Sequence, residues 1–281
     1  MNVGIICDLG YTLSTCYSNY YKAICNIFDN VTLVQSINDL EKIDLLFMGN
    51  DHHQGHLNIW RNESFINKCN NLKIPVCVYT AEYVGSSMFP WNTEIQKDLQ
   101  KFSNLSQRMI DINDCKTYGT AIARCACSKD LSYVKSYSPP EKLDKCVFIG
   151  KLYPEREKLI KELHSKGFKV EAFPYGMCDW DTYMKLIAQY RFVLSPYSND
   201  SNSFHLKFYE ALMVGSIPLH QVYEDTLNYY PIEAQLPDAI YFTTADELIS
   251  KVNQCTLTQS FSDIWLEDEL INFFKDIKVI Q

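Results

Sequence analysis

Short apolar runs alternate with segments of helical spacing along the whole chain. In the first half, runs typical of buried strands lie at 3–7, 31–34, 43–48, 74–79 and 122–127, and helix-like segments lie at 12–28, 64–72 and 93–105. In the second half, strand-like runs lie at 146–149, 168–173, 190–196, 217–219 and 239–242, and helix-like segments lie at 155–166, 181–189, 203–214 and beyond 244. Because strands that alternate with helices pair in parallel, the pattern predicts α/β architecture with ligand loops at the carboxyl ends of the strands.

The clearest interruption of this pattern is Ser138-Pro-Pro140, after which the alternation starts afresh. We therefore expect two doubly wound, Rossmann-like domains that face each other across a cleft, one over 1–140 and one over 141–260. The chain of 281 residues is long enough for both. The remaining tail, 261–281, contains an acidic amphipathic helix long enough to pack back on the first domain.

The most informative stretch runs from the strand at 190–196 through a polar loop into SFHLKFYEALMVGSIPLH. Ser203 is a suitable helix N-cap, and Gly215 fits the left-handed residue that ends a helix. Lys207 and Glu210 lie three residues apart, on one face near the helix N-terminus, where backbone N–H groups favour a phosphate. A lysine beside the phosphate and a carboxylate for ribose hydroxyls predict a nucleotide-diphosphate site. The alternative is a solvated ion pair.

Loops after the other strands of the second domain supply further candidates. Lys151 and Arg156 follow its first strand and would meet the diphosphate, although Arg156 would equally pair with glutamates on its own helix. Tyr175 would stack on the nucleotide base or belong to an ordinary turn. The small polar side chains of the loop and helix start would hold phosphate or sugar hydroxyls: Ser198, Asn199 and Ser203. His205 would reach the donor sugar or the leaving phosphate, or be a surface imidazole.

The first domain offers carboxylates for general-base chemistry. Asp51 and Glu82 each follow a predicted strand, with Asp8 as a third candidate, and the alternative for each is a cap or loop hydrogen bond. The histidines at 52, 53 and 56 have no obvious partner set for a metal. Asp179-Trp-Asp181 has the spacing of a metal-binding D-x-D, but its place at a helix start favours capping. We therefore expect no bound metal.

Composition narrows the function further. The net charge of −8 argues against a nucleic-acid or anionic-membrane binder, since both require a basic surface. The 11 cysteines are scattered through strand-like and helix-like runs, which indicates free thiols and a reducing, cytoplasmic compartment. The first strand begins at Val3, which leaves no room for a signal peptide, and no apolar run is long enough to span a bilayer.

The segment KFYEALMVGSIPLH resembles the donor-binding segment of GT-B glycosyltransferases, especially the exostosin-like and fucosyltransferase-like groups. Those proteins carry a basic residue, an acidic residue before Ala, a Gly and an Ile-Pro or Val-Pro strand. The resemblance covers residues 190–221. It implies an inverting, metal-independent transferase without a cofactor, which moves a sugar from a donor such as UDP-xylose, UDP-galactose or UDP-glucuronate to a glycan acceptor. The fucosyltransferase-like group would imply GDP-fucose instead.

The chain departs from this family in one respect, and one alternative function stays open. Exostosin-type enzymes of animals and plants usually carry an N-terminal membrane anchor, and this chain departs from them there. A non-catalytic protein with two domains that close on a small sugar or nucleotide would share the same layout and would need no base.

Overall fold

The computed structural model describes residues 1–6, 15–49, 62–79, 109–111, 127–174, 176–196, 206–222, 227, 233–259, 261, 263–276 and 278. Within these, the side chains of 15–19, 48–49, 78–79, 109–111 and 233 are not described. The chain forms two compact units, one of Met1–Arg124 with Trp265–Gln281 and one of Cys125–Ile264. The second unit thus begins at Cys125, whereas the sequence analysis placed the boundary after residue 140.

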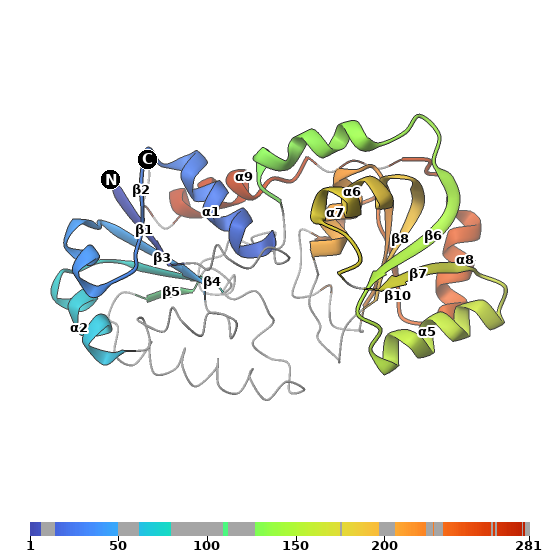
Figure 1. Ribbon diagram of the computed structural model, residues 1–281, viewed down its shortest axis with the longest axis horizontal. Helices are drawn as coiled ribbons and strands as arrows, with labels where there is room; N and C mark the ends of the chain where they lie inside the picture. The colour runs from blue at the N-terminus through green and yellow to red at the C-terminus, as the bar shows by residue number, and fades with distance from the viewer. Residues whose placement is uncertain are drawn as a thin grey trace. The chain divides into compact units, whose positions relative to one another are not determined.

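The first unit is built on a five-stranded parallel sheet in the order β2-β1-β3-β4-β5 (Figure 1). Its strands are β1 (Asn2–Ile6), β2 (Asn30–Leu33), β3 (Leu45–Gly49), β4 (Val76–Tyr79) and β5 (Met109–Asp111). Its helices are α1 (Thr15–Ile27), η1 (Ile37–Lys42), α2 (Glu63–Asn71) and α9 (Leu266–Asp276). Strand β5 was not predicted, because three residues are too few to show a period of alternation.

Helix α9 belongs to the first unit although it comes last in the chain. It packs on α1, where the rings of Phe28 and Phe274 meet edge to face with centroids 5.5 Å apart. Asn26 Nδ2 also donates to Oε1 of the buried Glu267 at 2.9 Å. Burial of the apolar stripe of α9 therefore ties the C-terminal segment to the N-terminal helix.

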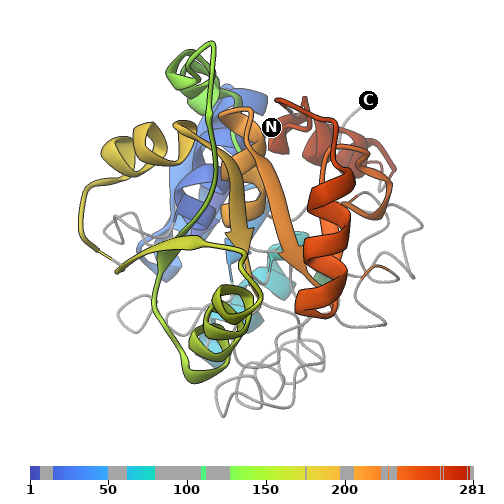
Figure 2. The same cartoon turned by 90° about the vertical axis from the view of Figure 1, so that its right-hand side faces the viewer.

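The second unit has its own parallel sheet in the order β10-β9-β8-β6-β7 (Figures 1 and 2). Its strands are β6 (Leu143–Gly150), β7 (Val170–Pro174), β8 (Tyr190–Ser195), β9 (Ile217–Gln221) and β10 (Ile240–Phe242). Its helices are η3 (Lys129–Tyr137), α5 (Pro154–Ser165), α6 (Trp180–Ala188), α7 (Leu206–Met213), η5 (Glu233–Gln235) and α8 (Ala245–Gln254). The predicted α/β fold with parallel sheets is confirmed in both units.

The direction of strand progression reverses at β6, which has β7 on one side and β8 on the other. Consequently α5, which follows β6, covers one face of the sheet, whereas α6 and α7, which come before and after β8, cover the other face. Helix α5 packs beside α8, and α6 packs beside α7 (Figures 1 and 2). In open parallel sheets, ligands bind outside the carboxyl ends of the strands at such a switch point. The starts of α5 and α7 both lie at this edge, so the topology brings two helix N-termini to one place.

Helix α7 ends in a Schellman motif that leads directly into β9. The N–H of Ser216 donates to the Ala211 carbonyl at 2.9 Å, and the N–H of Gly215 donates to the Leu212 carbonyl at 3.2 Å. Gly215 has φ +68°, which confirms the left-handed residue expected there. An added Cβ would lie 2.5 Å from Cζ of Phe261, so the ring of this exposed residue would have to move as well.

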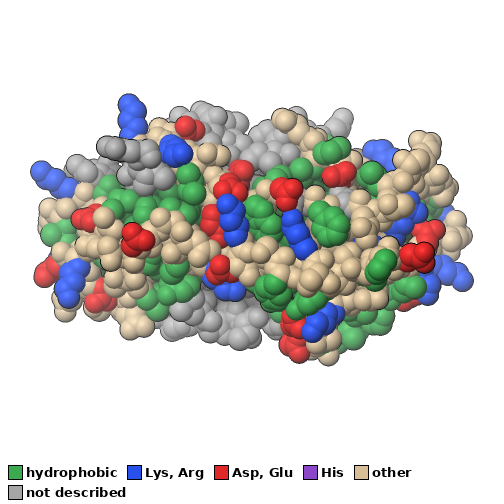
Figure 3. Space-filling view, turned by 90° about the horizontal axis from the view of Figure 1, so that it is seen from above, with side chains coloured by type: hydrophobic (Ala, Val, Ile, Leu, Met, Phe, Trp, Pro, Cys, Tyr) green, Lys and Arg blue, Asp and Glu red, His purple; other side chains and the backbone are tan. Residues whose placement is uncertain are grey.

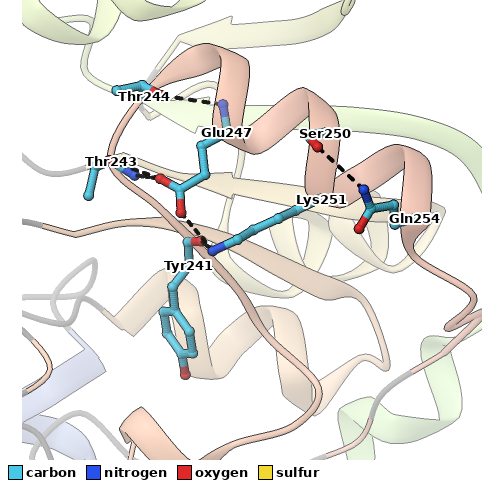
Figure 4. A network of polar contacts seen from close by, with 7 residues as sticks. All are labelled: Tyr241, Thr243, Thr244, Glu247, Ser250, Lys251 and Gln254. Atoms are coloured by element: carbon cyan, nitrogen blue, oxygen red, sulfur yellow. Dashed lines mark hydrogen bonds and ion pairs between the residues drawn. The ribbon is translucent and has the colours of Figure 1, made fainter.

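The N-caps of α6 and α8 are residues of types that commonly cap helices. Asp179 is the N-cap of α6 and accepts from the N–H of Thr182 at 2.8 Å, which confirms the capping interpretation of Asp179-Trp-Asp181. Thr244 caps α8 by accepting from the N–H of Glu247 at 3.2 Å (Figure 4). The Glu247 carboxylate in turn accepts from the N–H of Thr243 at 2.8 Å.

No helix in the described ranges is long and apolar enough to cross a membrane. On the face shown in Figure 3, acidic and basic side chains of the described residues are interspersed with apolar ones.

Candidate functional site

The two cations that the sequence analysis placed at the diphosphate come together at the carboxyl end of β6. Lys207 lies in the first turn of α7, and Arg156 lies in the first turn of α5, on the opposite face of the sheet. Both lie against the ring of Phe148, a fully buried residue of β6. The Lys207 Nζ is 4.7 Å from the ring centroid and the Arg156 guanidinium carbon is 5.8 Å from it. Both distances are typical of cation–π contacts.

Lys207 is anchored by the backbone of β6. Its half-buried ammonium donates a hydrogen bond to the Ile149 carbonyl, and no carboxylate among the described residues lies within ion-pair distance of it. The approach is close, because a Cβ at Gly150 would lie 3.0 Å from Lys207 Nζ and 3.1 Å from the Phe148 ring. Gly150 is therefore the residue that makes room for the amine at the end of β6.

Arg156 is held by the loop that joins β6 to α5. Its Nη1 donates to the Lys151 carbonyl at 3.0 Å, and its guanidinium lies 5.0 Å from the ring centroid of Tyr153. Lys151 itself is exposed, with Nζ 5.2 Å from the same ring. The loop thus presents two cations on one aromatic side chain, with Pro154 starting the helix behind them.

The pKa values of both half-buried cations are lowered from their usual values. Burial, with added repulsion from Arg156 and partial compensation from Glu210, lowers the pKa of Lys207 to about 8. Burial also lowers the pKa of Arg156 to about 10, so that this side chain stays charged at neutral pH. Two positive side chains at the starts of two helices form a place where a phosphate would be stabilised.

Glu210 is placed differently from what its spacing suggested. It is 7% exposed, and its Oε1 and Oε2 accept from Trp180 Nε1 at 3.2 Å and from the Tyr183 hydroxyl at 2.8 Å. Burial and the Glu210 charge raise the pKa of Tyr183 well above its usual value, so the hydroxyl remains a donor. Both oxygens are thus engaged with α6, and the expected contact to a ribose stays a prediction.

A buried polar contact between Ser195 of β8 and His220 of β9 joins the ends of these two strands next to α7. His220 Nδ1 lies 3.0 Å from Ser195 Oγ, and the His220 ring lies edge-on to Phe208 with centroids 5.4 Å apart. Burial lowers the pKa of His220 to about 3, so the ring is neutral. Through Phe208, the His220 ring packs against the first turn of α7. The sequence did not predict this contact, because it depends on the pairing of the two strands.

The remaining candidates lie outside the described residues. These are the proposed bases and the loop residues: Asp8, Asp51, Glu82, Tyr175, Ser198, Asn199, Ser203 and His205. The strand before Asp51, β3, ends at Gly49, at the point where β1 and β3 form the switch point of the first sheet. In the described part of the chain no cluster of His, Cys, Asp or Glu side chains is arranged to hold a metal ion.

Four contributors to the site were missed by sequence reasoning. Phe148 and Tyr153 form its aromatic support, and Trp180 and Tyr183 hold Glu210. Phe148 looks like any core residue of a strand, and nothing local separates it from its neighbours. Trp180 and Tyr183 lie three apart at the start of α6, so a shared direction was visible, but the acceptor they meet was not.

Comparison with known proteins gives no family for the chain. No protein-family model matches it, and no curated protein matches it in sequence. Among solved structures, one similar chain is described as a UDP-N-acetylglucosamine 2-epimerase from Listeria monocytogenes, with 8% identity, a TM-score of 0.48, and coverage of 100% of this chain and 97% of that one. A phosphoglycerate oxidoreductase from Vibrio cholerae has 11% identity, full coverage of both chains and a TM-score of 0.26. These values carry no functional argument, which therefore rests on the residues of the site.

Proposed function

We propose that the second unit binds the diphosphate of a nucleotide sugar and that the protein is a glycosyltransferase acting on a glycan hydroxyl. The observation that carries the proposal is the placement of the Lys207 ammonium. It lies in the first turn of α7, on the ring of Phe148 and next to Arg156, with no carboxylate among the described residues at ion-pair distance. The proposed donor is a UDP sugar such as UDP-xylose or a UDP-hexose.

In this proposal Lys207 and Arg156 stabilise the leaving group of the transfer reaction. As the bond from the anomeric carbon to the diphosphate breaks, negative charge grows on the phosphate oxygens, and a helix end with fixed cations offsets it without reorganising. Lys207 and Arg156 supply that charge, so the proposed reaction requires no metal. An inverting transfer also needs a base for the acceptor hydroxyl, and Asp51 and Glu82 stay our candidates for it.

A binding measurement tests the proposal. UDP and GDP are titrated into the wild-type protein and into Lys207→Met by isothermal titration calorimetry at pH 7. We expect wild type to bind UDP and Lys207→Met to bind it at least roughly tenfold more weakly, because one charge-assisted contact to phosphate is lost. The matched control is Lys161→Met, in which the removed lysine is exposed and pairs with Glu157 on α5.

Three outcomes separate the proposal from its rivals. Binding of UDP with equal strength to wild type and Lys207→Met would overturn the phosphate assignment. Preference for GDP would move the proposal to a GDP-fucose donor. Binding without hydrolysis of any UDP sugar, and without transfer to any oligosaccharide offered, would leave a nucleotide-binding protein and would refute the transferase.

A further inference from the structure

Lys142 lies between Ser138-Pro-Pro140 and β6, and its half-buried side chain reaches the carboxyl ends of two helices. Its Nζ donates to the carbonyl of Ala188, the last residue of α6. It also donates to the carbonyl of Val214, the residue after α7, at 2.8 Å, and to Ser216 Oγ at 3.3 Å. An ammonium has three N–H donors, so all three are used here, and the acceptors come from the ends of both helices.

These acceptors require a donor from outside their own helices. The last carbonyls of a helix have no partner within it, and the partial negative charge at a helix C-terminus favours a cation. Ala188, Val214 and Ser216 are fully buried, so bulk water does not reach them as a substitute. One ammonium therefore satisfies the carboxyl ends of α6 and α7 together.

Further hydrogen bonds surround this ammonium. The N–H of Leu143 donates to the Gln189 carbonyl at 2.7 Å, which fixes the start of β6 beside the end of α6. The Ser216 hydroxyl lies 2.8 Å from the Tyr190 carbonyl and 3.1 Å from the Ile187 carbonyl. The ends of α6 and α7 and the starts of β6 and β8 thus form one hydrogen-bonded group around Lys142.

We infer that Lys142 is a positioning residue for Lys207. Helix α7 has eight residues, so about 12 Å of rigid helix separates the first turn, which carries Lys207, from the end that Lys142 holds. Fixing this end against α6 therefore fixes where the first turn presents the Lys207 ammonium to the Phe148 ring and the Ile149 carbonyl. The consequence for ligand binding rests on the proposed function, whereas the position of Lys207 is a property of the ligand-free protein.

Loss of the Lys142 ammonium should separate the two helix ends. Lys142→Met withdraws the donor from two buried carbonyls and a buried hydroxyl, and a buried acceptor without a donor is costly. Water that enters to replace the donor moves the end of α7 away from α6, and the rigid helix transmits this tilt to Lys207. The matched control is Lys145→Met, in which the removed lysine is exposed and pairs with Glu171 at 2.7 Å.

The test measures the position of Lys207 by NMR in the ligand-free protein labelled at lysine, with the Lys207 signals assigned by their absence from Lys207→Arg. The Phe148 ring, whose centroid is 4.7 Å from Lys207 Nζ, shifts the signals of the side-chain protons next to the amine. In Lys142→Met this ring-current shift should shrink toward the value of a lysine in water. In Lys145→Met it should equal that of wild type.

A stability measurement separates positioning from a purely structural role. A lower melting temperature of Lys142→Met with wild-type Lys207 signals would show that Lys142 only stabilises the fold, and would overturn the inference. If Lys142→Met does not fold, Lys142→Gln, which keeps N–H donors without the charge, is measured in its place. Wild-type Lys207 signals in that variant would overturn the inference equally.

UDP affinity then tests the step from position to binding. In the wild-type background Lys142→Met should weaken UDP binding roughly threefold or more, and in the Lys207→Met background it should weaken it no further, because it acts through the missing amine. Distant residues normally act additively, so equal weakening in both backgrounds would overturn the inference. Altered Lys207 signals in Lys142→Met, when the wild-type protein binds no UDP, would refute the proposed function and support the inference.

Discussion

Replacing Lys207 by methionine should make the ligand-free protein more stable at neutral pH. The pKa of this amine falls from 10.5 to about 8 on folding. At roughly 1.4 kcal/mol per unit, holding it protonated in the folded state costs about 3 kcal/mol. Methionine removes that cost and also loses the hydrogen bond to the Ile149 carbonyl, worth about 1 kcal/mol. The expected net gain at pH 7 is therefore about 2 kcal/mol.

The difference in stability between Lys207→Met and wild type should depend on pH. Between pH 8 and 10.5 the unfolded chain keeps a proton on Lys207 that the folded protein releases, so the wild-type contribution to stability rises with pH across this window. The advantage of Lys207→Met is therefore full below pH 8 and shrinks as the pH approaches 10.5. Because the variant also lacks the hydrogen bond to the Ile149 carbonyl, we expect it to lose its stability advantage over wild type near pH 10.5.

The assay is urea unfolding at pH 7 and at pH 9.5 for wild type, Lys207→Met and the control Lys161→Met. Comparison of each variant with wild type at the same pH cancels the contributions of all other groups. A Lys207→Met protein that is less stable than wild type at pH 7, or a difference that does not change with pH, would refute a net cost of burying the Lys207 charge. Together with weakened UDP binding, the expected result would show stability given up for function.

Two further changes test the elements that position the site. Gly215→Ala should lower the free energy of unfolding by about 2 kcal/mol or more, because φ +68° is strained for alanine and its Cβ meets the Phe261 ring, and equal urea midpoints of variant and wild type would contradict this. Glu247→Gln should cost about 1 kcal/mol at pH 7, after discounting for exposure, and nothing near pH 2. The pKa of Glu247 is lowered to about 2, chiefly by Lys251, so its contribution is present above pH 4.5 and lost as the pH falls toward 2; thermal melts at pH 7 and pH 2.5 check the difference.

The fold was predictable from the sequence wherever a local rule decides the structure. Short apolar runs between segments of helical spacing located both parallel sheets. Gly215 and Asp179 were assigned correctly because a left-handed helix end and an N-cap depend on adjacent residues alone. Strand β5, Met109–Asp111, was missed because it is defined by its pairing with β4 rather than by its own pattern.

The site shows the same division between local and tertiary information. Lys207 and Arg156 were found from their places at helix starts after strands, which is a property of the chain order. The ring that both cations contact was not predicted, because Phe148 meets them only when α5 and α7 pack on opposite faces of the sheet around β6. Glu210 was singled out from its spacing to Lys207, but its partners on α6 depend on helix packing that spacing within α7 does not reveal.

Proton uptake on UDP binding tests the central claim most directly. At pH 8.5 a ligand-free Lys207 with a pKa of about 8 is mostly neutral, and a phosphate placed beside it restores its proton. Calorimetry in two buffers of different ionisation enthalpy should therefore show roughly half a proton or more taken up per UDP in wild type. Lys207→Arg, which stays charged throughout, should bind UDP with no such uptake. Binding of UDP to wild type with the same proton balance as Lys207→Arg would contradict a phosphate at Lys207.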